Sequence, residues 1–277
     1  TSVTGKSLDQ IQNLIEDEMV SQSANLDSIT ADLEVKLTRG KDVVPLKNVA
    51  GVLEGNGPLA NETIVIGAHY DHLGLGDQGS SLDANPQDKI HNGADDNASG
   101  VAGLLYLAGK LSQSCPAYSY IFLATDAEEN GLYGSKAFVA QPPVALSSIV
   151  LNLNLDMLGR PDRRGKLYLT GAGRYPALKA ELAPAFSRIQ FLHHRGPSRM
   201  LRDKVRYDWP NASDHGPFYR AGIGYLFFGG QDHRHYHMPD DTWQRIEPVF
   251  LDMAIQAIWQ TVQRARRLSL NPPPSDC

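Results

Sequence analysis

At residues 91–100 the chain reads His-Asn-Gly-Ala-Asp-Asp-Asn-Ala-Ser-Gly, which places the adjacent carboxylates of Asp95 and Asp96 just before an apolar run. Apolar side chains recur in that run at helical spacing, at Val101, Leu104, Leu105, Ala108 and Leu111. The two aspartates therefore stand where a helix begins. They are either helix caps, which a helix N-terminus favours, or part of a polar site shared with other segments.

Three other segments favour the second interpretation, because each follows an apolar run typical of a buried strand. The runs span residues 64–68, 118–125 and 149–155, and the polar groups after them are His69 with Asp71, Glu128 with Glu129, and Asp156. Helical patterns alternate with these strands, which predicts an α/β fold with a mainly parallel sheet. Ligands of such sheets bind outside the carboxyl ends of the strands, where these side chains lie.

The remaining elements are predicted from periodicity and turn residues. We expect an N-terminal amphipathic helix at 8–19, strands at 35–37, 48–53, 167–170 and 225–228, helices around 132–138 and 176–186, a short helix opening at 213–215, and a closing helix through 251–262. Residues 74–90 form a polar loop beside the site, and residues 233–242 form another.

Length and composition set the outer bounds. With 277 residues and 42% hydrophobic content, the chain is expected to form one large domain over 1–270, followed by a Pro-rich flexible tail at 271–277. A net charge of -5 gives no reason to expect nucleic acid as a partner, and no apolar run approaches a membrane span. The two cysteines, Cys115 and Cys277, exclude a disulfide framework and a thiolate zinc site, although they could pair with each other.

Histidines and carboxylates without thiolates are the ligand set of zinc or a similar divalent ion. Five candidate ligands converge on one rim, namely His69, Asp96, Glu129, Asp156 and His237. Five ligands suit two metals if one carboxylate bridges them, and two-metal sites suit hydrolysis.

Glu128 is then left beside the ligand Glu129. Adjacent residues in extended backbone point to opposite sides, so one of the two can bind metal while the other faces the substrate. A carboxylate placed there can move a proton from water to a leaving amine. The alternative is a pair of exposed loop carboxylates, which is the commoner setting for glutamate.

These motifs resemble the di-zinc aminopeptidase family that includes the bacterial leucine aminopeptidases of Aeromonas and Streptomyces. Glutamate carboxypeptidase II, the transferrin receptor and glutaminyl cyclase are more distant relatives. The matching segments, in the family's order, are 67–71, 93–100, 127–135, 154–157, 213–215 and 236–237. The resemblance implies a three-layer sandwich whose central mixed, mainly parallel sheet is flanked by helices.

The resemblance also implies roles for single residues. His69 and Asp156 would bind one Zn²⁺, Glu129 and His237 a second, and Asp96 would bridge the two ions. Glu128 would be general base and acid, Asp71 would orient His69, and Tyr236 is a candidate to stabilise the oxyanion. A cis peptide would join Asp96 to Asn97. Asp96 is chosen over Asp95, and His237 over His215, His233 and His235, by the family pattern alone.

The implied activity is hydrolysis of the N-terminal peptide bond of peptides with a free amino terminus, in a secreted or periplasmic protein. The sequence His-Tyr-Asp-His-Leu-Gly at 69–74 departs from the His-Leu-Asp-Ser form of the small secreted enzymes and is similar to the bacterial branch that carries a protease-associated domain.

Two other functions stay open, and a third is disfavoured. A carboxypeptidase would need a basic clamp, for which Arg199, Arg202 and Arg206 are candidates, although a basic run is usually a solvated face. A receptor or binding module would keep the fold without the chemistry. Glutaminyl cyclase chemistry uses a single zinc, and the retained Glu128 and Glu129 argue against it.

Overall fold

Strand β3 (Thr63–His69) is the centre of the fold, and all seven of its residues are buried. The computed structural model describes residues 30–39, 42–76, 80–84, 89–185, 189–191, 195–196 and 207–265. The helix predicted at 8–19, the tail at 271–277 and most of the basic segment fall outside these ranges.

The strands and helices occur where the apolar patterns predicted them, with some differences in length. The strands are β1 (Thr30–Arg39), β2 (Asp42–Leu53), β3, β4 (Ser119–Thr125), β5 (Ile149–Asp156), β6 (Leu167–Thr170), β7 (Ile189–Phe191), β8 (Arg195–Gly196), β9 (Tyr207–Asp208) and β10 (Tyr225–Gly229). The helices are α2 (Gly100–Ser112), α3 (Tyr133–Ala140), α4 (Pro176–Ala185), α5 (His215–Arg220) and α6 (Pro248–Ala265). Strands β1 and β2 are longer than predicted and pair as an antiparallel ribbon, while the short strands β7 to β9 were not predicted.

Eight of these strands form one sheet in the order β1-β2-β4-β3-β5-β10-β6-β7. The four middle strands β4, β3, β5 and β10 are mutually parallel, whereas β2 and β6 join them antiparallel on the two sides. The mixed, mainly parallel sheet is thus confirmed. In the parallel part His69 is level with Thr125, and Asp156 is level with Gly229, so four carboxyl ends meet at one edge.

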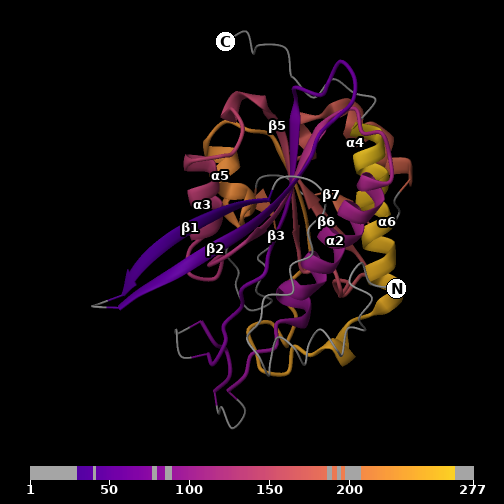
Figure 1. Cartoon of the computed structure of the whole chain (residues 1–277). Helices are drawn as coiled ribbons and strands as arrows, with labels where there is room; N and C mark the ends of the chain where they lie inside the picture. The colour runs from indigo at the N-terminus through magenta and orange to yellow at the C-terminus, as the bar shows by residue number, and fades with distance from the viewer. Residues whose placement is uncertain are drawn as a thin grey trace.

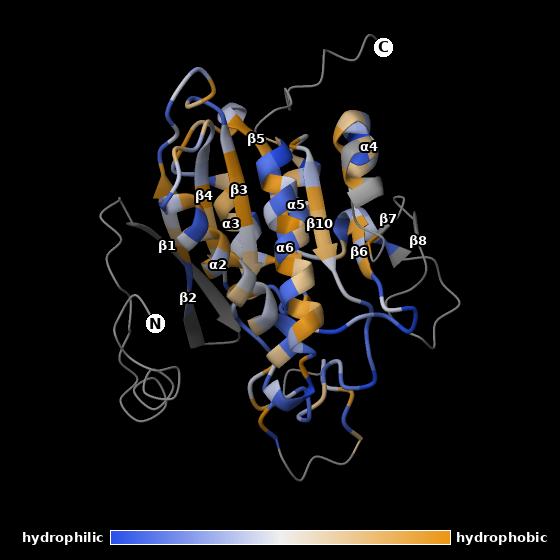
Figure 2. Cartoon of the chain, turned by 90° about the vertical axis from the view of Figure 1, so that its right-hand side faces the viewer, coloured by the Kyte–Doolittle hydropathy of each residue, from blue (hydrophilic) through white to orange (hydrophobic). Residues whose placement is uncertain are grey.

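Helices cover both faces of the sheet, which gives the three layers (Figure 1). Helices α2, α4 and α6 share the larger core, with Leu107, Leu178 and Ile258 among its buried members. Helices α3 and α5 lie on the other face, where Phe138 and Phe218 pack together. The apolar strands lie between the helices (Figure 2). None of the described helices is long and apolar enough to span a membrane.

The segment before α2 differs from a simple helix start. Helix α2 begins only at Gly100, and a kinked turn, η1 (Ala94–Ser99), precedes it with non-helical backbone at Asp96 and Asn97. The peptide bond between these two residues is cis, as the resemblance implied. Neither aspartate caps α2, because its N-cap Ser99 has no side-chain capping bond and Asp95 bonds elsewhere. The capping interpretation is therefore wrong, since η1 carries Asp95 and Asp96 five and four residues before Gly100, the first residue of α2.

Candidate metal centre

The candidate site lies at the edge where the four parallel strands end. His69 is the last residue of β3, Asp156 is the last residue of β5, and Glu129 follows β4 by four residues. His237 comes from the loop after β10, and η1 brings Asp96 beside them. All five predicted ligands therefore meet in one place.

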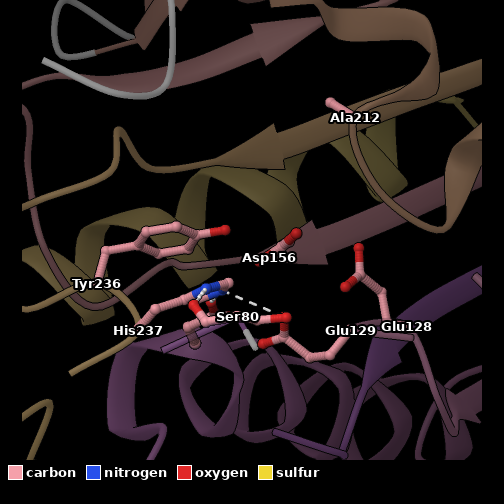
Figure 3. Close-up of a pocket in the computed structure, with 8 residues that line it drawn as sticks. Ser80, Glu128, Glu129, Asp156, Ala212, Tyr236 and His237 are labelled. Atoms are coloured by element: carbon pink, nitrogen blue, oxygen red, sulfur yellow. Dashed lines mark hydrogen bonds and ion pairs between the residues drawn. The ribbon is translucent and has the colours of Figure 1, made fainter. Parts of the chain in front are cut away.

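Asp96 stands between two pairs of groups. Its Oδ1 lies 3.2 Å from Nε2 of His69, and that same nitrogen lies 3.6 Å from Oδ1 of Asp156. Its Oδ2 lies 3.5 Å from Nε2 of His237, which is 3.2 Å from Oε2 of Glu129. Figure 3 shows His237 and Glu129 directed at each other across the floor of the cavity. The arrangement is two imidazole–carboxylate pairs that share one carboxylate.

The two imidazoles are oriented by backbone carbonyls. Nδ1 of His69 lies 3.0 Å from the carbonyl oxygen of Asp71, and Nδ1 of His237 lies 2.9 Å from that of Ser80. A carbonyl oxygen only accepts hydrogen bonds, so each ring carries its hydrogen on Nδ1. Each Nε2 then points a lone pair at carboxylate oxygens, and both Nε2 atoms are buried without a hydrogen bond. A cation between nitrogen and oxygen resolves this repulsion, so the residues fit a metal pair.

The pKa shifts of the two histidines and of Asp96 also indicate that the site stabilises positive charge. Burial alone would lower the pKa of His237, but Asp96 and Glu129 raise it to about 10. Burial alone would raise the pKa of Asp96, but His237 and His69 hold it well below its usual range. The pKa of His69 is also raised well above its usual range, because the carboxylates around it outweigh its burial. The cavity thus stabilises a proton or a metal ion at these nitrogens.

Glu128 and Glu129 are adjacent in the sequence, but their carboxylates point in different directions. Figure 3 shows the Glu128 carboxylate pointing to a different part of the cavity from that of Glu129. Burial raises the pKa of Glu128 well above its usual range, the charge on His69 lowers it, and Asp156 and Asp214 raise it further. One ligand atom each of His69, Glu128 and Asp156 also lie within 4.8 Å of one another, so geometry alone admits Glu128 as a ligand.

Asp71 holds the loop that carries both glutamates. Its Oδ1 accepts the backbone N–H of Glu128 at 3.1 Å, and its Oδ2 accepts that of Glu129 at 3.3 Å. The same carboxylate lies 3.6 Å from Nδ1 of His69. Nδ1 of His69 donates its hydrogen bond to the backbone carbonyl of Asp71, so orientation of His69 by the Asp71 carboxylate stays a prediction, and the two hydrogen bonds from the backbone N–H groups were not predicted from the sequence.

The centre opens into a cavity of about 220 Å³. Its lining residues are Ser80, Asp96, Glu128, Glu129, Asp156, Ala212, Tyr236 and His237. Tyr236 stacks on the ring of His237 with 3.8 Å between ring centroids, and its hydroxyl points toward the middle of the cavity (Figure 3). The structure thus brings the predicted oxyanion residue to the cavity wall.

The competing histidines are held outside this centre. His215 stacks between Tyr225 and Phe227 at 4.6 Å. His233 lies 3.1 Å from Asp95, and His235 pairs with Asp240 at 2.6 Å. Each has a structural role within the described part of the chain.

Asp95 and Asp214 also serve as supports rather than as ligands. Asp95 is fully buried, and its Oδ1 accepts the N–H of Gly159 at 2.6 Å. Asp214 lies at the start of α5 without capping it and accepts a hydrogen bond from Thr125 across the sheet edge. Burial raises the pKa of Asp214 to about 6.

Two residues near the centre were missed by the sequence reasoning. Oδ2 of Asp241 accepts the backbone N–H of both Asp95 and Asp96, at 3.0 and 3.2 Å, and so fixes η1. His72 contacts Glu129 at 2.8 Å. Asp241 gave no signal in the sequence because its partners lie about 145 residues away. His72 gave a signal, since it is where the chain departs from the family motif.

A three-layer α/β sandwich with two imidazole–carboxylate pairs at the carboxyl edge of its sheet is the architecture of a zinc-exopeptidase-like protein. A family model for Peptidase family M28 matches residues 48–262, and the chain belongs to that family. The resemblance drawn from the sequence motifs is thereby confirmed.

Individual relatives extend the comparison. The chain is 27% identical to Aminopeptidase YwaD of Bacillus subtilis (strain 168) over 235 residues, which is 80% of this chain and 46% of that protein. It is 27% identical to the solved aminopeptidase from Aneurinibacillus sp. strain AM-1, with a TM-score of 0.61 over 84% of this chain and 52% of that one. The chain thus spans about half the length of these relatives.

The fold extends to a second class of protein. Porphyromonas gingivalis glutaminyl cyclase is 20% identical with a TM-score of 0.68, and the match covers 86% of this chain and 84% of that one. At this identity the likeness is one of fold alone.

Proposed function

We propose that the protein is a di-zinc aminopeptidase, an exopeptidase that hydrolyses the N-terminal peptide bond of peptides. The observation that carries this proposal is the Asp96 carboxylate lying between two imidazole–carboxylate pairs, with Glu128 beside them in the same cavity. The relatives described as aminopeptidases support the exopeptidase class.

The ligands divide into two sets. His69 and Asp156 would hold one Zn²⁺, Glu129 and His237 would hold the other, and Asp96, which lies between the two pairs, would be shared by both. When bound, the two ions polarise the scissile carbonyl and acidify the attacking water. The buried, unbonded Nε2 atoms of the two histidines are the support for this assignment.

Glu128 moves the proton. Because burial raises its pKa, its carboxylate is a stronger base than an exposed glutamate, as a general base requires. It accepts a proton from the attacking water and delivers it to the nitrogen of the leaving amine, which departs neutral. Asp71 keeps Glu128 in place through the hydrogen bond to its backbone N–H. Tyr236 is placed to donate its hydroxyl hydrogen to the oxyanion.

The described lining of the cavity has no basic clamp for a terminal carboxylate, which favours the aminopeptidase over the carboxypeptidase. Four of the eight lining residues are carboxylates, and no lysine or arginine is among the described residues of the lining. Three of these carboxylates are the proposed metal ligands and are neutralised when the ions bind, but a carboxypeptidase would still need a basic clamp for the terminal carboxylate, which the described lining does not supply. The candidate clamp residues at 199–206 lie outside the described ranges, so the carboxypeptidase stays the second candidate.

The test compares aminoacyl anilides with N-blocked anilides, with and without chelator, on the wild type and on Glu128→Gln. We expect chelator-sensitive cleavage of free-amine substrates only. Glu128→Gln should lower kcat by about 10²–10⁴-fold, the usual contribution of a general base, while zinc content stays at the wild-type value. Glu54→Gln, an exposed glutamate, is the matched control and should keep full activity.

Other outcomes would point elsewhere. Cleavage of N-blocked peptides that end in a free carboxylate would indicate a carboxypeptidase. Cyclisation of an N-terminal glutamine, included because of the shared fold, would indicate a cyclase. A protein that holds two zinc ions and turns over no substrate of the panel would contradict the proposal and favour a binding module.

A further inference from the structure

We propose that His72 is a positioning residue for the metal centre: it holds one oxygen of Glu129, so that this carboxylate offers only its other oxygen to an ion. The inference rests on the proposed function, because it assumes that Glu129 and His237 bind metal. One ligand atom each of His72, Asp96 and Glu129 lie within 4.8 Å of one another, so the inference assigns a supporting role to a side chain that geometry alone also admits as a ligand.

The two oxygens of Glu129 face different partners. Oε1 lies 2.8 Å from Nδ1 of His72, within hydrogen-bonding distance. Oε2 lies 3.2 Å from Nε2 of His237, on the side where an ion fits. This division favours a one-oxygen binding mode, because the hydrogen bond to Oε1 opposes rotation of the carboxylate toward a position where both oxygens face the ion.

The direction of the hydrogen bond follows from the chemistry of the two groups. An ionised carboxylate only accepts hydrogen bonds, so the hydrogen lies on Nδ1 of His72. His69 and His237 also carry their hydrogen on Nδ1, but they give it to backbone carbonyls and turn Nε2 to the centre. His72 instead donates its Nδ1 hydrogen to the carboxylate of Glu129, the proposed ligand. Ligating carboxylates are commonly held by such a hydrogen bond from a neighbouring side chain.

The ring of His72 is fixed by its packing. Its side chain is 9% exposed, and it meets the ring of His237 edge-on with 5.8 Å between ring centroids. It also lies against Gly93, where a Cβ atom would come within 2.7 Å of Cγ of His72. Gly93 has a φ of 62°, which favours glycine, so this close approach costs the backbone nothing. A ring that is held on two sides can set the position of Glu129.

Glu129 is thus held at both ends by neighbouring residues. Asp71 accepts its backbone N–H at 3.3 Å, and His72 donates to its side chain at 2.8 Å. Asp71 and His72 are consecutive residues, and they follow the end of β3 after one intervening residue, Tyr70. The end of one strand therefore places a ligand that the next strand supplies.

The test measures metal binding rather than turnover. Wild type, His72→Ala and His72→Asn are loaded with zinc, equilibrated with a graded series of chelator concentrations, and analysed for zinc per chain. Asparagine places a donor nitrogen near the position of Nδ1, so it keeps the hydrogen bond that alanine removes. Tyr70→Phe is the matched control, because it removes the hydrogen bond from Tyr70 to Lys47 in the same loop without touching Glu129.

We expect His72→Ala to lose one of its two ions at a chelator concentration about 10–100-fold lower than the wild type, the usual effect of removing a group that supports a ligand. The second ion, held by His69 and Asp156, should be retained as in the wild type. His72→Asn and Tyr70→Phe should keep both ions. Melting temperatures of the metal-free proteins identify any variant that loses zinc only because it unfolds.

Two results would overturn the inference while leaving the proposed function intact. In the first, His72→Ala binds both ions as tightly as the wild type. In the second, His72→Asn loses zinc as readily as His72→Ala, and the visible spectra show a lower cobalt coordination number in both variants than in the wild type. That result would mean that His72 is itself a ligand. A wild type that binds no zinc would overturn the proposed function and the inference together.

Discussion

Asp96 is the residue that both halves of the site share. One of its oxygens faces His69 and the other faces His237, so under the proposed function its orientation decides whether two ions can bind. Residues that bind no metal set this orientation. Asp241 accepts the N–H of Asp96, and the side chain of Asn97 bonds the carbonyl of Leu155 at 2.9 Å. The chemistry of the ligands therefore depends on buried hydrogen bonds one layer further out.

Asp71 offers a test at this scale. We predict that Asp71→Asn lowers zinc affinity and kcat by about 10–100-fold, because the amide has a single acceptor oxygen and would face its NH₂ toward one of the two backbone N–H groups. Zinc retention against chelator and anilide turnover measure the two effects. Asp126→Asn is the matched control, since Asp126 also accepts two backbone N–H groups in this region but touches no ligand. Equal losses in both variants would show that only loop folding is at stake.

At the scale of elements, the site is a consequence of parallel strands. The carboxyl ends of β3, β4, β5 and β10 meet at one edge, and each of these strands ends at a proposed ligand or leads into the loop that carries one. The turn η1 is the exception, because it reaches the edge through its own broken backbone. Asn97 holds it there, with Oδ1 accepting the N–H of Gly100 at 3.0 Å and that of Met157 at 3.1 Å.

Gly100 tests this junction between η1 and α2. We predict that Gly100→Ala destabilises the protein by about 1–3 kcal/mol, because a Cβ there would lie 2.5 Å from the carbonyl oxygen of Leu155 and closer still to Asn97. The free energy of unfolding in urea measures the effect. Gly109→Ala, in the same helix with nothing within 4 Å, should instead gain roughly 0.5–1 kcal/mol from helix propensity. A stable Gly100→Ala would mean that η1 tolerates a shift of Asn97.

At the scale of the whole molecule, the sequence predicted correctly those features that depend on residues close together in the chain. Continuous apolar runs and apolar residues at helical spacing predicted the strands and helices of the α/β fold, and polar residues after the apolar runs predicted the edge of the sheet where the site lies. What it could not predict depends on distant partners. The apolar period from Val101 onward says nothing of the break at Asp96, because Asp241 and Leu155 supply the bonds that make it. His72 likewise needs the position of Glu129, 57 residues on.

Metal removal tests the molecule as a unit, because the ions would join β3, β5, η1 and two loops in one centre. A ligand that binds only the folded state at 100 to 1,000 times its Kd adds about 3–4 kcal/mol of stability. For a domain of this size each kcal/mol shifts Tm by roughly 2–4 °C, so we predict that chelation lowers Tm by about 5–15 °C. Differential scanning calorimetry of zinc-loaded and chelated protein measures the shift.

The control for that experiment is Asp96→Ala, which lacks the carboxylate shared by both pairs. Its Tm should lie near that of the chelated wild type and should not respond to chelator or to added zinc. Restoring zinc to the chelated wild type should recover the higher Tm, which separates metal loss from irreversible damage. A wild type whose Tm ignores chelation would mean that the buried Nε2 atoms of His69 and His237 are satisfied by protons alone, and the metal centre would have to be abandoned.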